Sequence, residues 1–69
     1  MLRKTVQSTN LASVGYEEAS RTLEIEFQNG RVYRYQGVPK QIFDQLMSAA
    51  SHGQFFNSFI KDHYPYREI

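Results

Sequence analysis

The chain has no cysteine and no long apolar run among its 69 residues. Without cysteine, neither a disulfide nor a thiolate metal site can stabilise it. No stretch approaches the ~20 apolar residues of a membrane-spanning helix, and Met1–Lys4 is not followed by the apolar segment of a signal peptide. We therefore expect a cytoplasmic protein that has no membrane partner.

An excess of charge is also missing, since eight basic and seven acidic residues give a net charge of +1. A domain of this size that is dedicated to nucleic acid is usually more basic. The composition therefore argues weakly against that role, although it leaves room for a local basic patch.

Aromatic residues are what the chain does have: five Phe and five Tyr. A domain this short buries only about 60% of the surface of its extended chain, so its core is small. Each large aromatic side chain can bury roughly 150–250 Å². We therefore expect most of these side chains to be structural.

The segment from Thr22 to Phe27 alternates apolar and polar side chains and is followed by Gln28-Asn29-Gly30, which together predict a β-hairpin. A two-residue loop would set Arg34 opposite Ile25 on the apolar face. A three-residue loop with Gly30 in a left-handed conformation avoids this. We therefore predict the longer loop, with the cross-strand pairs Leu23–Tyr35, Glu24–Arg34 and Ile25–Tyr33.

Residues 6–17 predict a first strand, preceded by a polar start, residues 1–5, that we expect to fray. In this strand Val14 lies on one face, and Leu11 and Gly15 lie on the other. A glycine inside a strand indicates a bulge or a close approach of two backbones.

Two helices are predicted after the hairpin. Pro39 suits the first turn of a helix that runs to about Ala49, because its missing N–H would be unpaired there. Ser51 and Gln54 have the spacing of a capping box, which predicts the start of a second helix ending near Asp62.

The last residues, 64–69, cannot extend the second helix, because Tyr64 precedes a proline. We expect this tail to fold back, since its two tyrosines would otherwise lie in water, and we expect the second helix to bury Phe59 and Ile60. The sequence thus predicts a single α+β domain, residues 1–69: a three-stranded antiparallel β-meander followed by two helices packed on one face.

Several short motifs occur in a recognisable order: Ser8-Thr9-Asn10, Ser13-Val14-Gly15-Tyr16, Asn29-Gly30, Tyr33-x-Tyr35, Val38-Pro39 and Ser51-x-Gly53-x-Phe55-Phe56-Asn57. They resemble the KTSC domain family, which is named after the C-terminal domain of some lysyl-tRNA synthetases and also includes small stand-alone bacterial proteins. Glu17, where aspartate or a similar turn residue is expected, is a small departure. The resemblance implies the predicted fold and, by analogy, an RNA or tRNA partner, and it carries over no catalytic residue.

Five basic residues are candidates for phosphate contacts with RNA: Arg31, Arg34, Lys40, Lys61 and Arg67. The alternative is a solvated face neutralised by acidic neighbours, which the nearly equal acidic count favours. Tyr33 and Tyr35 could stack on nucleobases, but the predicted register places their rings in the core. We therefore assign Tyr33, Tyr35, Gly30 and Pro39 a structural role.

A small polar groove is a further candidate site, lined by Ser51, Gly53 and Asn57. The side chain of Asn57 could instead bond the backbone of the hairpin or of the first strand. Both roles remain open.

Enzymatic chemistry finds little support in the sequence. His52 and His63 are too few for a metal site, which needs three or four ligands, so we predict no metal and no cofactor. Ser8 or Thr9 beside His52 would lack a carboxylate to orient the histidine.

The favoured hypothesis is a non-enzymatic module that binds RNA or tRNA. The alternative is a protein–protein or self-association module that uses the open sheet face or edge.

Overall fold

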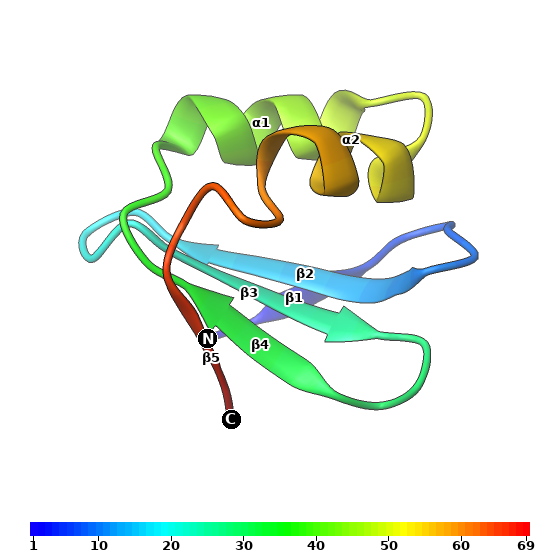
Figure 1. Cartoon of the computed structure of the whole chain (residues 1–69), viewed down its shortest axis with the longest axis horizontal. Coiled ribbons are helices and arrows are strands. Elements are labelled where there is room, and N and C mark those ends of the chain that lie inside the picture. The colour runs from blue at the N-terminus through cyan, green and yellow to red at the C-terminus, as the bar shows by residue number, and fades with distance from the viewer.

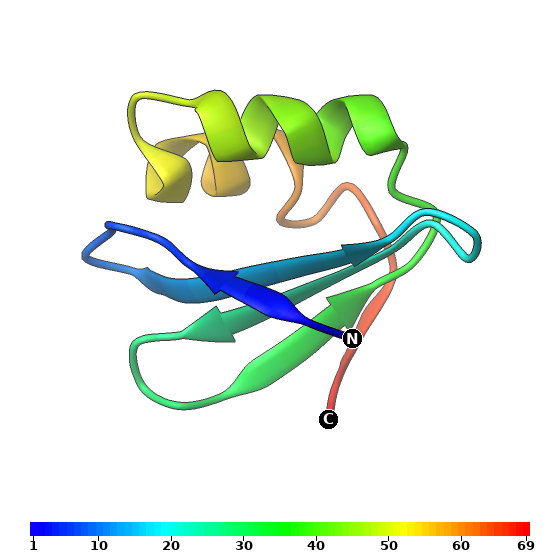
Figure 2. The same cartoon turned by 180° about the vertical axis from the view of Figure 1, so that it is seen from behind.

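Five antiparallel strands form one sheet, and two helices lie across one of its faces (Figure 1). The computed structural model describes residues 1–69 and contains strands β1 Arg3–Thr5, β2 Leu11–Glu17, β3 Thr22–Phe27, β4 Val32–Tyr35 and β5 Tyr66–Glu68, and helices α1 Lys40–Ser48 and α2 His52–Phe59. The strands lie in the order β1-β2-β3-β4-β5. The view from behind shows no helix against the second face, which we call the open face (Figure 2). Neither helix has the length and apolar character needed to cross a membrane.

The α+β class with two helices on one face is confirmed, but the predicted number of strands was wrong. Both missed strands are edges of the sheet. Strand β1, in the segment expected to fray, pairs with β2, and β5, in the tail, pairs with β4. Each edge strand has three residues and exposed side chains, so neither shows the apolar alternation from which strands are predicted.

The β3–β4 hairpin has the predicted register, with Leu23 opposite Tyr35, Glu24 opposite Arg34 and Ile25 opposite Tyr33. Gly30 has a φ of 89°, which is the left-handed conformation that glycine adopts without steric cost. The three-residue loop is therefore confirmed. It places Tyr33 and Tyr35 beneath the helices and Arg34 on the open face.

A bulge in β2 changes the face on which Leu11 lies. Leu11 is opposite Phe27 and Ser13 is opposite Glu26, so Ala12 is an extra residue without a partner. Leu11 therefore joins Val14 beneath the helices, where both are buried. The prediction of opposite faces was wrong because regular alternation cannot reveal an inserted residue.

The helix starts differ slightly from the prediction. Pro39 is the residue before α1, not its first helical residue, and its carbonyl accepts hydrogen bonds from the N–H groups of Ile42 and Phe43. Ser51 caps α2 as predicted, and its hydroxyl accepts from the N–H of Gln54 at 3.2 Å. The side chain of Gln54 makes no return bond, so the capping box is only half formed.

Helix α2 ends at Phe59, short of the predicted end at Asp62. Asp62 has a φ of 67°, and this left-handed residue turns the chain toward β5. Ile60 is fully buried, but Phe59 is 54% exposed, so the expectation that Phe59 is buried was wrong.

The core between sheet and helices consists of nine buried residues: Leu11, Val14, Leu23, Ile25, Tyr35, Val38, Leu46, Phe56 and Ile60. Only Tyr35 and Phe56 among them are aromatic. Phe27 and Tyr33 pack against this core and remain partly accessible. Part of the aromatic surface of the domain therefore lines an accessible site.

Candidate functional site

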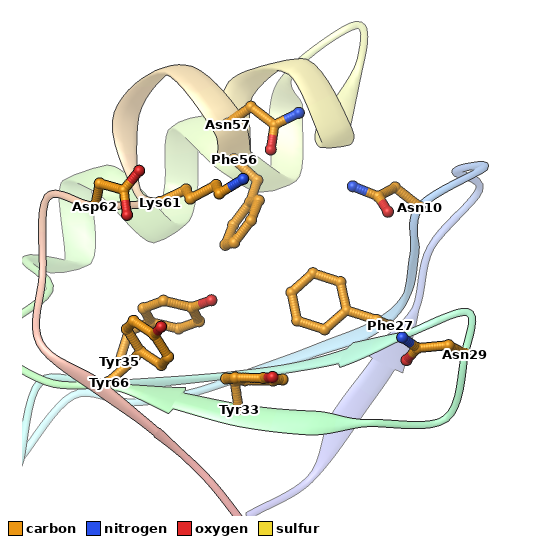
Figure 3. A pocket seen from close by; sticks show the side chains of 10 residues that line it. All are labelled: Asn10, Phe27, Asn29, Tyr33, Tyr35, Phe56, Asn57, Lys61, Asp62 and Tyr66. Atoms are coloured by element: carbon orange, nitrogen blue, oxygen red, sulfur yellow. The ribbon is translucent and has the colours of Figure 1, made fainter.

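A groove opens between α2 and the strands β3 to β5 (Figure 3). Its volume of about 310 Å³ is at the lower end of the range for small-molecule sites. Ten residues line it: Asn10, Phe27, Asn29, Tyr33, Tyr35, Phe56, Asn57, Lys61, Asp62 and Tyr66. Five of them are hydrophobic. Aromatic walls with a few polar groups are typical of a binding site.

The walls are made by an aromatic cluster of Phe27, Tyr33, Tyr35, Phe56 and Tyr66, whose rings form a closed circuit. The ring centroids are 5.6 Å apart for Phe27–Tyr33, 5.5 Å for Tyr33–Tyr66, 5.5 Å for Tyr66–Tyr35, 5.6 Å for Tyr35–Phe56 and 5.4 Å for Phe56–Phe27. These edge-to-face and tilted arrangements are favourable for aromatic pairs. Each ring is therefore held by two neighbours in the cluster.

The backbone explains why these rings meet. Alternation along β4 directs Tyr33 and Tyr35 to the same face, and the pairing of β5 with β4 sets Tyr66 opposite Tyr35. Phe27 comes from the end of β3, and Phe56 comes from the buried side of α2. Sequence reasoning missed Phe27 and Tyr66 as site residues, since nothing local distinguishes them from core aromatics.

Tyr35 is the most buried tyrosine of the cluster, with only 4% of its surface exposed. Burial, with smaller contributions from the nearby groups of Tyr66, Tyr33 and Asp62, raises the pKa of the Tyr35 hydroxyl to about 12. The hydroxyl therefore stays protonated at neutral pH and can donate a hydrogen bond into the groove.

The polar groups of the groove come from opposite sides. Figure 3 shows the Asn57 amide on α2 and the Asn10 amide from the loop before β2 projecting toward the opening, and the Lys61 side chain extending into the groove from the turn after α2. All three side chains are exposed, and none of them takes part in the side-chain hydrogen bonds or ion pairs of the protein. They are therefore available to a ligand.

A second, polar hollow adjoins the groove and shares Asn10 and Asn57 with it. The structure brings together Ser51, Gly53 and Asn57 in this hollow, facing the loop at residues 7–10. A Cβ built at Gly53 would lie 3.5 Å from Cβ of Asn10, which shows how closely α2 approaches this loop. The predicted polar groove is thus one end of a longer depression.

The hydroxyl and histidine of this hollow have structural partners. The Ser8 hydroxyl accepts from the N–H groups of Asn10 and Leu11, each at 3.1 Å. The His52 Nδ1 lies 2.8 Å from the Leu46 carbonyl, so in the neutral ring Nδ1 carries the proton. No carboxylate bonds His52, and no three His, Asp or Glu side chains gather as a metal site would require. The hollow therefore lacks an assembled nucleophile and base.

The five basic candidates do not share one surface. Arg34 and Arg67 are directly opposite on β4 and β5, on the open face. Arg31 immediately precedes β4, and its guanidinium lies 3.9 Å from the carboxylate of Glu68. Lys61 lines the groove on the helix side, and Lys40 pairs with Asp44 on α1 at 3.1 Å. The structure thus places the three arginines on or next to β4 and β5, and it separates the two lysines from them.

A row of residues crosses the open face in register: Arg3, Gly15, Glu24, Arg34 and Arg67, one from each strand. Glu24 is 4% exposed and accepts from Arg3 at 2.6 Å and from Arg34 at 2.8 Å. Burial would raise the pKa of the Glu24 carboxyl, but the hydrogen bonds from Arg34 and Arg3 outweigh it and hold the pKa below its usual value. Sequence reasoning missed Arg3 because its segment was expected to fray.

The glycine of this row makes room for the ion pair. A Cβ at Gly15 would lie 2.7 Å from the Leu2 carbonyl oxygen and 2.9 Å from Cγ of Arg3. The close backbone approach predicted at this glycine is confirmed. The stem of Arg3 crosses the bare backbone of Gly15 to reach Glu24.

Fold and site define a small α+β domain with an aromatic groove on one side of its sheet and an arginine-rich row on the other. The sequence profile of the KTSC domain matches residues 7–64, and the chain belongs to this family. A crystal structure of a KTSC domain protein from Yersinia pestis matches with a TM-score of 0.94 and 40% identity, covering 99% of this chain and 96% of that one.

Related sequences occur in two settings. A protein of Stutzerimonas stutzeri, described as uncharacterised, is 41% identical over 70 residues, which cover 100% of this chain and 99% of that protein. A lysine–tRNA ligase of Nostoc punctiforme is 43% identical over 54 residues, which cover 78% of this chain but only 10% of the ligase. A similar domain can therefore make up almost a whole small protein or a tenth of a large enzyme.

Proposed function

We propose that this KTSC domain is a non-catalytic module that binds RNA, with tRNA as its partner, through phosphate contacts on the open face of the sheet. The observation that carries the proposal is an imbalance of charge in the cross-strand row. Arg3 and Arg34 share the single carboxylate of Glu24, and Arg67 has no acidic partner.

The physics of this row favours an anionic partner. Two like charges directly opposite each other on adjacent strands destabilise a sheet, and Arg34 and Arg67 are such a pair. Arg34 bonds Glu24 through Nε alone, so both of its terminal amino groups remain available. A guanidinium matches the geometry of a phosphate and binds it with two parallel hydrogen bonds.

The likeness to part of a lysine–tRNA ligase supports RNA as the source of the phosphates. The net charge of +1 limits the number of contacts, so binding is weak and largely independent of sequence. A cytoplasmic location is part of the proposal, because tRNA is found there.

Arg67 offers a clean test, because it has no ion pair whose loss would disturb the fold. Labelled tRNA is titrated with the protein at several salt concentrations, and binding is followed by fluorescence anisotropy. Arg67→Ala should weaken binding and lower the slope of log affinity against log salt by about 1. Lys40→Ala is the matched control, because Lys40 is paired with Asp44 on α1, and it should leave the slope unchanged.

Two results would contradict the proposal. One is the absence of binding at low salt, where electrostatic attraction is strongest. The other is an equal effect of the Arg67 and Lys40 variants, because it would show that only the overall charge matters. Either result would leave protein–protein association as the hypothesis to test next.

A further inference from the structure

The aromatic cluster leaves its groove accessible. Tyr66 is 56% exposed, although its ring contacts both Tyr33 and Tyr35. The exposed amides of Asn10 and Asn57 and the ammonium of Lys61 take part in none of the side-chain hydrogen bonds or ion pairs of the protein. A groove that combines aromatic walls with unpaired donors and acceptors has the composition of a ligand site.

We propose that this groove binds one unpaired nucleotide of an RNA, with its base against the aromatic cluster and its phosphate at Lys61. The inference rests on the proposed function, because it takes RNA as the source of the nucleotide. It adds a base-binding site on the helix side of the sheet to a module whose open face is proposed to contact only phosphates.

A planar heterocycle matches the walls better than an aliphatic ligand does. Tyr66 presents a face at the exposed end of the groove, and bases stack on such rings irrespective of sequence. The edge of a base carries both donors and acceptors, and the amides of Asn10 and Asn57 can meet either kind. The hydroxyl of Tyr35, which stays protonated at neutral pH, can donate a further hydrogen bond.

The charge at the groove distinguishes a nucleotide from the other ligand that aromatic clusters bind, an organic cation. A cation in this groove would meet the ammonium of Lys61, which lines the groove (Figure 3). The carboxylate of Asp62 lies at the end of the groove and forms no ion pair with Lys61. Lys61 therefore remains available to a phosphate.

The base must be unpaired. The groove is bounded by α2 on one side and by the sheet on the other, so a base within a duplex could not enter it. Proteins that read single-stranded RNA commonly hold splayed bases on aromatic side chains in this way. Loops and single-stranded ends of RNA are therefore the fitting ligands.

Strand β5 joins the groove to the arginine row. On this edge strand Tyr66 faces the groove and the next residue, Arg67, faces the open side, and Tyr35 and Arg34 alternate in the same way on β4. No further strand lies beyond β5. An RNA chain that passes around this edge can place a base in the groove and phosphates on the arginines.

The test compares three RNAs of equal length by fluorescence anisotropy: a single strand, the same strand with abasic sites, and a duplex. Because stacking of one base contributes about 1–3 kcal/mol, the intact single strand should bind roughly 5- to 150-fold more tightly than the abasic one. Asn57→Ala and Tyr66→Ala should remove most of this difference, and both residues are exposed, so the fold should survive. Ser58→Ala, an exposed neighbour outside the groove, is the control.

A second readout examines the groove directly. A nucleoside 5′-monophosphate should shift the amide resonances of α2 and β4 around the groove and leave those of α1 unchanged. If abasic and intact strands bind equally and the two groove variants match the parent, the groove inference is wrong while phosphate binding stands. If no RNA binds but the monophosphate shifts the groove, the proposed function fails and a nucleotide site remains. If neither ligand binds, both are wrong.

Discussion

Glu24 is the one carboxylate that ties the first strand of the sheet to the fourth, and its replacement tests this role. In Glu24→Gln the shape is kept and the charge is lost. Hydrogen bonds to a charged group contribute about 1.5–3 kcal/mol each. The side chains of Arg3 and Arg34 are 29% and 37% exposed, so both recover part of their hydration when the carboxylate is gone. We therefore expect the variant to lose about 1–3 kcal/mol of unfolding free energy in total.

The pH dependence of this loss identifies its cause. Because the folded state lowers the pKa of Glu24, the stabilisation is fully present above the ordinary glutamate pKa of 4.5 and disappears as the pH falls through the lower folded value. At acidic pH the parent carries a neutral Glu24, which glutamine imitates. The difference between parent and variant should therefore be largest near neutral pH and vanish in strong acid.

Urea unfolding followed by circular dichroism measures both quantities, from about pH 7 to about pH 2.5. The matched control is Glu26→Gln on the same strand, because Glu26 bonds only the neutral hydroxyl of Ser13, at 2.9 Å. Its effect should be smaller. An unchanged unfolding midpoint for Glu24→Gln at neutral pH, or a difference that persists in acid, would refute this reasoning.

Three further changes test the backbone. Gly15→Ala should lower the unfolding free energy by about 1–3 kcal/mol, because the new Cβ would lie 2.7 Å from the Leu2 carbonyl oxygen. Hydrogen exchange should then show that β1 opens first, and full protection of β1 would contradict this. Gly30→Ala should lower the unfolding free energy measured by urea titration by about 1 kcal/mol. The cause is the φ of 89° alone, since no atom lies within 4 Å of the new Cβ. Equal stability would be evidence against the turn. Deleting residues 66–69 should lower the melting temperature, because β5 pairs with β4 and Tyr66 contacts two other rings. Each ~1 kcal/mol of unfolding free energy that is lost corresponds to a decrease of roughly 4–8 °C. An unchanged melting curve would show that the strand is dispensable.

The central hairpin could be predicted because its information is local. The alternation of Leu23, Ile25 and Phe27 and the position of Gly30 leave one register that keeps arginine off the apolar face, and the structure has that register. The edge strands could not be predicted in this way. Strand β1 is held by Arg3, which reaches Glu24 on a strand that is 21 residues away in sequence. Such pairing depends on tertiary contact and leaves no pattern in a three-residue segment.

The site was only partly predictable for a related reason. Ser51 and Gly53 follow the signal of a helix start, and the structure places them with Asn57 at one hollow. The aromatic cluster combines residues from three strands and a helix, and a sequence indicates only that such side chains are apolar. Whether five rings close over one another or leave a groove depends on the positions of β5 and α2. Those positions are set by long-range packing.

The aromatic cluster also affects the intrinsic fluorescence of the protein. The chain has five tyrosines and no tryptophan, so tyrosine supplies its intrinsic fluorescence. Three of these five emitters, Tyr33, Tyr35 and Tyr66, line the groove, whereas Tyr16 stacks on Phe43 of α1. A ligand that stacks in the groove would quench most of the emission, and one that binds only the open face would leave the emission nearly unchanged. The unlabelled protein thus carries an optical reporter that distinguishes its two candidate surfaces.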